Sequence, residues 1–374
     1  SRPTSALVTG QLSVAAATSG KDDPRWRRVT APRTFAFPDD HGPHQEYQTE
    51  WWYYTGNLQA ENGHEFGFQL TFFRRGLDPE PAQRASRWAT RNTYLAHFTV
   101  SDLTNNRFYA AERFSRDGAA LAGASGNPFR VWIGKWQATG SGPEALSMRL
   151  EAAADEMAID LQLQSTKPPT LQGDRGYSPK GRGPGNASYY YSLTRMATTG
   201  KVTVKGTPYQ IREGATWMDH DWGTWRLDAD VPGWDWFGLH LSDGREITCA
   251  RFRRSDGTPA PETYAMVTAA DGTKTLLGLG DVTLVVLQYW TSPRSGGRYP
   301  AGWRLRIPKA GLDLRITPRM ADQELPLLSI VYWEGAVAVE GQTLAADGTA
   351  TPVAGQGYVE LTGYLPSSGR GASR

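Results

Sequence analysis

The sequence contains a single cysteine, Cys249, among 374 residues. One cysteine excludes an intramolecular disulfide framework and a cysteine-rich zinc site. It fits a reducing compartment and equally an exported protein that its cores alone stabilise. The cysteine count therefore excludes two kinds of structural support but does not identify the cellular compartment.

The sequence also lacks an excess of charge of one sign and any long apolar run. Lys and Arg number 40 against 38 Asp and Glu, a net charge of +2, so we expect no nucleic-acid partner. No apolar run approaches the length of about 18 residues that a transmembrane helix needs. The chain opens on Ser1 rather than Met, and we expect a periplasmic or secreted protein whose leader has been removed.

Several catalytic motifs are absent. The segment 123–127 lacks the last glycine of a serine-nucleophile elbow, and Gly200-Lys201 lacks the residues that complete a phosphate-binding loop. The glycines of the segment 181–185 have the wrong spacing for a dinucleotide-binding fold. We therefore expect no nucleotide cofactor, and ester hydrolysis is weakened as a candidate activity.

Histidine is scarce, with six residues in the whole chain. His41 and His44 lie near Asp39 and Asp40 in the N-terminal segment, where we expect them to be solvated. No group of three histidines and acids has a recognisable ligand spacing, so we predict no metal site.

Aromatic residues and glycine are abundant, with Trp 14, Tyr 16, Phe 12 and Gly 41. Phe66, Phe68, Leu70 and Phe72 alternate with smaller or polar residues, which indicates a strand with one apolar face. Similar short runs recur along the chain, separated by Asn-Gly and Asp-Gly turns. The only helix that we predict spans 79–89, so the fold is expected to be all-β, with antiparallel sheets closed into barrels.

An internal repeat predicts two β-domains. The pattern Trp-x-aromatic-x-Gly occurs at Trp52–Gly56 and again at Trp234–Gly238, 182 residues later. A second echo matches the segments 200–206 and 335–341, and each is followed by a strand with an aromatic residue and an acid, Thr216–Asp219 and Gly357–Glu360. We predict an extended lead-in over 1–45, a first barrel over 46–227 and a second over 228–374. The glycine-rich basic segment 168–185 fits either a solvated loop or a lid over a barrel mouth.

Three segments combine aromatic and ionisable residues: 50–54, 217–223 and 234–237. On a strand, Asp219 and Asp221 share one face and His220 and Trp222 share the other. An acid beside aromatic faces suits acid-catalysed alkene chemistry, because the acid donates a proton and the rings stabilise a carbocation. The same clusters also fit a structural plug that closes a barrel. His97 lies among apolar residues, where a core histidine is expected rather than a base.

Five segments in order resemble the AttH-type lipocalin-like family, which includes carotenoid 1,2-hydratases and predicted secreted hydrolases: Glu50–Gly56, Trp217–Gly223, Gly233–Phe237, Tyr289–Pro293 and Tyr332–Gly335. The resemblance runs from about Thr34 to Tyr364. It implies two tandem lipocalin-like (calycin-type) antiparallel β-barrels and an apolar, isoprenoid-like substrate. In a hydratase of this family, the matching segment places His220 and Trp222 in the site.

We therefore predict a hydro-lyase that adds water across a C=C bond of an apolar substrate. The catalytic candidates are Asp219, His220, Asp221 and Asp235, and His220 would position the acid or the water. The residues expected to contact the substrate are Glu50, Trp51, Trp52, Tyr53, His97, Trp217, Trp222, Trp234 and Trp236. The alternatives are a lipid-binding or lipid-delivery protein peripheral to a membrane or a transporter, and a secreted hydrolase. In each case we expect a monomer with a hydrophobic or lipid ligand.

Overall fold

The computed structural model describes residues 23–80, 90–326 and 330–366. These residues form strands joined by turns and five short 3-10 segments, and contain no α-helix. Nothing helical within them is both long and apolar enough to cross a membrane. Most of the helix predicted over 79–89 lies outside the described residues.

The first sheet contains the strands of the N-terminal half and has the order β4-β3-β2-β1-β13-β12-β9-β8-β7-β6-β5, all antiparallel. Two short strands, β10 and β11, pair with β12 outside this path. The bounds are β1 Thr49–Ala60, β2 Glu65–Gly76, β3 Asn92–Asp102, β4 Arg107–Arg116, β5 Ala122–Gly126, β6 Phe129–Ile133, β7 Trp136–Ser141, β8 Ser147–Ala154, β9 Met157–Ser165, β10 Thr170–Leu171, β11 Tyr177–Pro179, β12 Ala187–Val204 and β13 Thr207–Gly223.

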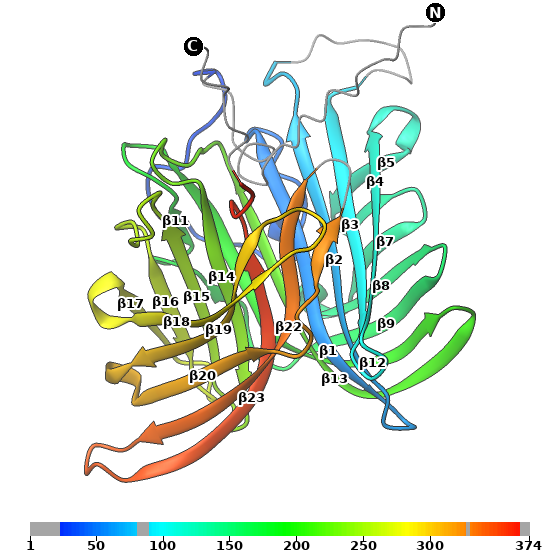
Figure 1. Ribbon diagram of the computed structural model, residues 1–374. Helices are drawn as coiled ribbons and strands as arrows, with labels where there is room; N and C mark the ends of the chain where they lie inside the picture. Colours follow the sequence, from blue (N-terminus) through cyan, green and yellow to red (C-terminus); the bar gives the residue numbers. More distant parts are fainter. Residues whose placement is uncertain (1–22, 81–89, 327–329, 367–374) are drawn as a thin grey trace, which may run out of the picture.

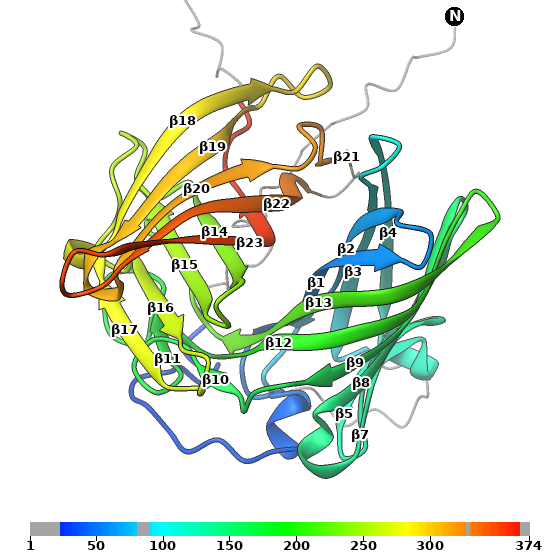
Figure 2. The ribbon, with the colours of Figure 1, turned by 90° about the horizontal axis from the view of Figure 1, so that it is seen from below.

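The second sheet has the order β17-β16-β15-β14-β23-β22-β20-β19-β18, and β21 pairs with β22. Its strands are β14 Gly233–Leu241, β15 Glu246–Arg253, β16 Tyr264–Thr268, β17 Lys274–Gly278, β18 Thr283–Thr291, β19 Arg298–Ile307, β20 Leu312–Pro318, β21 Glu324–Pro326, β22 Val331–Leu344 and β23 Ala350–Leu361. Both sheets are curled into nearly closed barrels, as the view from below shows (Figure 2). The all-β prediction of two antiparallel barrels is confirmed.

Side chains fill the interior of each barrel. Phe66, Phe68, Leu70 and Phe72, the face predicted from their alternation, belong to the core of the first barrel. Phe237 and its buried neighbours form a separate core in the second barrel. The interiors therefore consist of packed cores.

The two barrels pack against each other through outward faces of their sheets. Strand β1 lies beside β23, and β2 lies beside β22, in the middle of the molecule (Figure 1). A third hydrophobic cluster joins them, and it includes Tyr53 and Trp217 from the first sheet and Trp236 and Tyr358 from the second. We call this contact between the barrels the seam.

The offset of 182 residues that aligns the two sequence motifs differs by one residue from the offset that aligns the two strands in space. Trp52 points into the first barrel core, whereas Trp234, its counterpart at an offset of 182, packs against the seam cluster. The side chain that truly corresponds to Trp234 is Trp51, which also borders the seam. Because side chains alternate along a strand, this shift of one residue moves the matched tryptophans to opposite faces.

The expectation that the N-terminal histidines are solvated is wrong. His41 and His44, expected to be solvated, are 0% and 9% exposed, because the segment 23–48 packs against the first barrel. The segment 168–185 is not simply a solvated loop, because β10 and β11 attach it to β12 and Lys180 is 6% exposed.

The packed core of the first barrel gives a test of the fold. Phe68 is fully buried there, whereas Phe114 on β4 is 73% exposed. Phe68→Ala should lower the free energy of unfolding by about 3–5 kcal/mol, through lost burial and the cavity left behind. Phe114→Ala should change it by less than about 0.5 kcal/mol. Denaturant unfolding followed by tryptophan fluorescence measures both, and similar losses in the two variants would contradict this packing.

Candidate functional site

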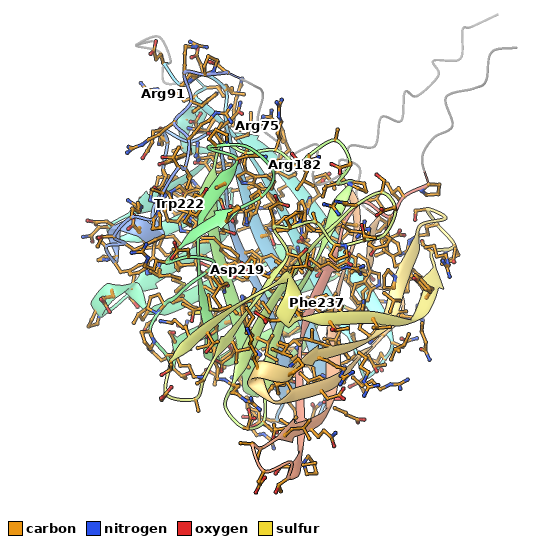
Figure 3. All side chains as sticks on the ribbon, turned by 90° about the vertical axis from the view of Figure 1, so that its left-hand side faces the viewer. Arg75, Arg91, Arg182, Asp219, Trp222 and Phe237 are labelled. Atoms are coloured by element: carbon orange, nitrogen blue, oxygen red, sulfur yellow. The ribbon has the colours of Figure 1, made fainter. Side chains whose placement is uncertain are left out.

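A pocket opens in the seam and draws its lining from both barrels. Its cavity volume is about 70 Å³. Most of the lining is aromatic, with three acids and one lysine among it: Trp51, Tyr53, Thr71, Phe73, Lys180, Tyr190, Asp219, Asp221, Trp225, Trp234, Trp236, Ala250, Phe252 and Glu360. Figure 3 shows Asp219 between the two barrels, with Trp222 toward the first and Phe237 toward the second.

On the first barrel, the residues that line the pocket form two rows of side chains that run across neighbouring strands. Trp51 of β1 lies between Phe73 of β2 and Asp221 of β13, and Tyr190 of β12 follows on the far side of Asp221. In the next row, Tyr53 pairs with Asp219 in the same way. Side chains two residues apart share a face, so both acids of the Asp-His-Asp segment reach the seam.

The second barrel supplies the facing wall. Trp236 of β14 lies beside Glu360 of β23, and Glu360 lies beside Glu334 of β22. Trp234, two residues before Trp236, pairs with Phe252 of β15. Tyr53 and Trp236 meet across the seam with ring centroids 5.1 Å apart. Aromatic contacts therefore join the two walls.

Asp219 is a buried acid whose hydrogen-bond donors are all neutral. Tyr190 OH donates to its Oδ2 at 2.7 Å, while Ser192 Oγ and Trp217 Nε1 donate to Oδ1 at 2.5 and 2.7 Å. Burial outweighs these hydrogen bonds and raises the pKa of Asp219 to about 7. At neutral pH, Asp219 therefore populates both its protonated form and its carboxylate form.

Asp221 has a different environment although it is only two residues away. Lys180 Nζ lies 2.9 Å from its Oδ2, and Ser188 Oγ donates to the same oxygen at 2.6 Å. Lys180 and Ser188 therefore both contact one oxygen of Asp221. The other oxygen, Oδ1, is buried without a hydrogen-bond partner in the described structure. Asp221 thus offers a free acceptor oxygen in a residue that lines the pocket.

The remaining predicted residues lie elsewhere. Trp217 contacts Asp219 from within the seam, and His97 hydrogen-bonds Tyr332 OH at 2.8 Å away from the pocket lining. Asp235 is buried with Arg253 at 2.5 Å, on the face of β14 that carries Phe237 into the second barrel core. The structure therefore separates Asp235 from Asp219.

Four predicted residues face the interior of the first barrel: Glu50, Trp52, His220 and Trp222. His220 lies on the opposite face of β13 from Asp219 and Asp221. We therefore assign His220 no part in positioning an acid or water in the seam pocket. Its neighbours are instead Glu50, at 2.9 Å, and the ring of Trp52.

The sequence did not single out several pocket residues. Tyr190 lies in a run of three tyrosines, and Lys180 lies in the basic segment 168–185. Glu360 matched Asp219 in the second echo. That match was the sequence signal that the two strands each place an acid at the seam. Nothing in the sequence indicated that Phe73, Trp225 or Phe252 would reach the pocket.

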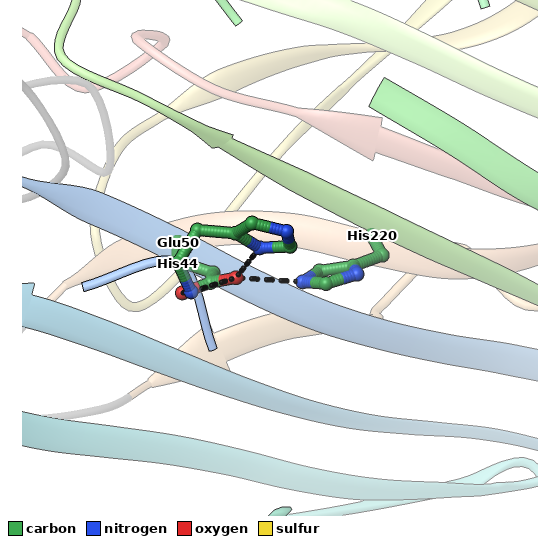
Figure 4. Close-up of side chains that lie close together, drawn as sticks. All are labelled: His44, Glu50 and His220. Carbon is green, nitrogen blue, oxygen red and sulfur yellow. Dashed lines mark hydrogen bonds and ion pairs between the residues drawn. The ribbon is translucent and has the colours of Figure 1, made fainter. Parts of the chain in front are cut away.

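His44, Glu50 and His220 form a cluster with the donor atoms of a metal site (Figure 4). Both ring nitrogens of His44 contact carboxylates, Nδ1 with Glu50 and Nε2 with Asp40, each at 2.9 Å. This favours the imidazolium form, which has no lone pair for a metal. Arg74 Nε also donates to Glu50 at 2.9 Å. The cluster is therefore better explained as a buried hydrogen-bond network.

The chain belongs to the AttH-like family, whose family model matches residues 28–364. It is similar to the crystal structure of an AttH protein from Nitrosomonas europaea, with 31% identity and a TM-score of 0.79 over 91% of this chain and 100% of that one. Kievitone hydratase from Nectria haematococca has 19% identity and a TM-score of 0.68, covering 93% and 98%. CghA has 13% identity and a TM-score of 0.52, covering 87% and 90%. The last two likenesses concern the fold alone. A comparison with curated proteins gave no match.

The His44 network predicts a pH-dependent stability. Burial acts to lower the pKa of His44, but its contacts with Asp40 and Glu50 outweigh this, so the pKa is raised. The stabilisation is complete below the unfolded value of about 6.5 and is lost as the pH rises through the folded value. His44→Gln should therefore cost more stability at about pH 5.5 than at alkaline pH. Thermal melts across this range measure the difference, and an equal cost at every pH would contradict the network.

Proposed function

We propose that the protein is a hydro-lyase that adds water across a C=C bond of an apolar, isoprenoid-like substrate in the seam pocket. The observation that carries the proposal is the pair Asp219 and Asp221 on one face of β13. Asp219 is buried among neutral hydrogen-bond donors, and Asp221 is paired with Lys180. Two carboxyl groups with contrasting environments provide an acid and a base in one site.

In the proposed reaction, the Asp219 carboxyl transfers its proton to one alkene carbon. The π electrons form the new C–H bond and leave a carbocation on the other carbon. The aromatic walls, with Trp51, Trp234 and Trp236 among them, stabilise this cation through their π faces. Water bonds to the cation and gives its extra proton to Asp221. Transfer of that proton back to Asp219 restores the site.

The composition of the pocket supports this chemistry over ester hydrolysis. Its lining residues include no Ser, Cys or His, so neither a Ser–His nor a Cys–His pair is found among them. A non-catalytic lipid carrier would use the same aromatic walls. It would not need a buried carboxyl group whose pKa is raised to about 7.

Isotope labelling tests the reaction directly. We expect incubation with geraniol, farnesol and squalene in ¹⁸O-labelled water to give a labelled alcohol from at least one compound. Asp219→Asn should reduce kcat by about 100-fold or more, because it cannot donate the proton. Glu213→Gln, an exposed change on the same strand, is the control. No label in any product of the wild-type protein would contradict hydration and favour the carrier.

The pH dependence gives a second prediction. Asp219 must be protonated to act, and its pKa is raised to about 7. The rate should therefore be highest in mild acid and fall as the pH rises through about 7. Initial rates across this range with a compound that turns over measure the profile. A rate that increases through the same range would contradict Asp219 as the acid.

A further inference from the structure

The second barrel contributes two carboxyl groups to the seam that the proposed reaction has not used. Glu334 and Glu360 lie directly opposite each other on β22 and β23. Glu334 is fully buried, and Glu360 lines the pocket. Because Glu360 also lies beside Trp236, its carboxyl group belongs to the wall that faces Asp219.

The described partners of this pair are neutral groups. Tyr53 OH, from the first barrel, donates to Glu334 Oε1 at 2.6 Å. Trp234 Nε1 donates to Glu360 Oε1. The two carboxyl groups also hydrogen-bond with each other, which requires a proton on at least one of them. Burial is the main cause that raises the pKa of both groups.

The hydrogen bonds indicate which proton leaves first. When Glu360 ionises, its carboxylate keeps two donors, the indole N–H of Trp234 and the O–H of Glu334. When Glu334 ionises instead, the charge is moved away from Trp234 and from the pocket lining. The single charge of the pair is therefore favoured on Glu360, beside any ligand in the pocket.

We propose that Glu360 is a second general acid of the seam pocket, facing Asp219 from the other barrel, and that Glu334 is its positioning residue. This inference rests on the proposed hydration. The proton of Glu360 passes to an alkene carbon, the π electrons form the C–H bond, and the charge left on Glu360 stabilises the carbocation. Water then adds to the cation and gives its proton to Asp221, as before, and that proton returns to Glu360.

The competing explanation is structural, because the contact between Tyr53 and Glu334 also links the two barrels. The tests must therefore measure the ionisation of Glu360 and the effect of that ionisation on the binding of a cation in the pocket. Both quantities are measurable without a substrate. Glu340→Gln is a matched control, since Glu340 lies on the same strand as Glu334 and is exposed.

Infrared spectroscopy detects protonated carboxyl groups by their C=O stretching band. In an Asp219→Asn background, which removes the other proton donor proposed for the pocket, we expect one carboxyl C=O band to disappear as the pH rises through the neutral range. Adding Glu360→Gln should remove this titration, and adding Glu340→Gln should leave it. Glu334→Leu, which deletes the O–H donor, should move the titration to higher pH, and Glu334→Gln, which keeps an N–H donor, should restore it. The same titration in the presence of Glu360→Gln would overturn the proposal.

Binding of octyltrimethylammonium tests the negative charge that Glu360 gains when it ionises. This cationic probe resembles a carbocation on an apolar chain. Calorimetry with the Asp219→Asn protein should show an affinity that increases by about tenfold as the pH rises and Glu360 ionises. Glu360→Gln should remove this increase, while Glu340→Gln should retain it. An equal pH dependence with and without Glu360 would overturn the assignment.

The two proposals can fail separately. An infrared titration that does not depend on Glu360 refutes the second acid and leaves hydration through Asp219 intact. The lack of ¹⁸O-labelled product from the wild-type protein refutes hydration, even where Glu360 titrates as expected.

Discussion

The packing of two barrels through their outward faces is the interaction on which the site depends. Alone, each barrel would expose those faces to water. Together they bury Trp217, Trp236, Phe252 and Tyr358 in one cluster and enclose an aromatic pocket beside it. Each barrel has its own packed core, and the aromatic pocket lies between the barrels in the seam.

Burial in this seam gives its acids their chemical character. Glu50 is equally buried, but it faces the interior of the first barrel, where its contacts with Arg74 and two histidines outweigh burial and lower its pKa. Asp219 and Glu360 instead have neutral donors, so burial raises the pKa of each. Glu50 is therefore favoured as a carboxylate, whereas the pKa values of Asp219 and Glu360 are shifted toward the protonated form.

Much of the fold and part of the site could be predicted from the sequence. Alternation identified the core face of Phe66 to Phe72, and it placed Asp219 and Asp221 on one face of a strand with His220 on the other. It could not show which face meets the second barrel, because that depends on packing between strands far apart in the chain. The repeat misaligned Trp52 with Trp234 by one residue for the same reason. Lys180 contacts Asp221 and Glu334 contacts Tyr53, and no local pattern encodes these contacts between residues far apart in the chain.

The location of the ligand is the most direct test of the central claim, that the seam rather than a barrel interior is the functional site. A crystal structure of the protein with bound farnesol measures it. The account predicts that the apolar chain lies between Trp51 and Trp234, with a C=C bond near Asp219 or Glu360. A chain bound inside the first barrel, against Trp52 and Trp222, would contradict it.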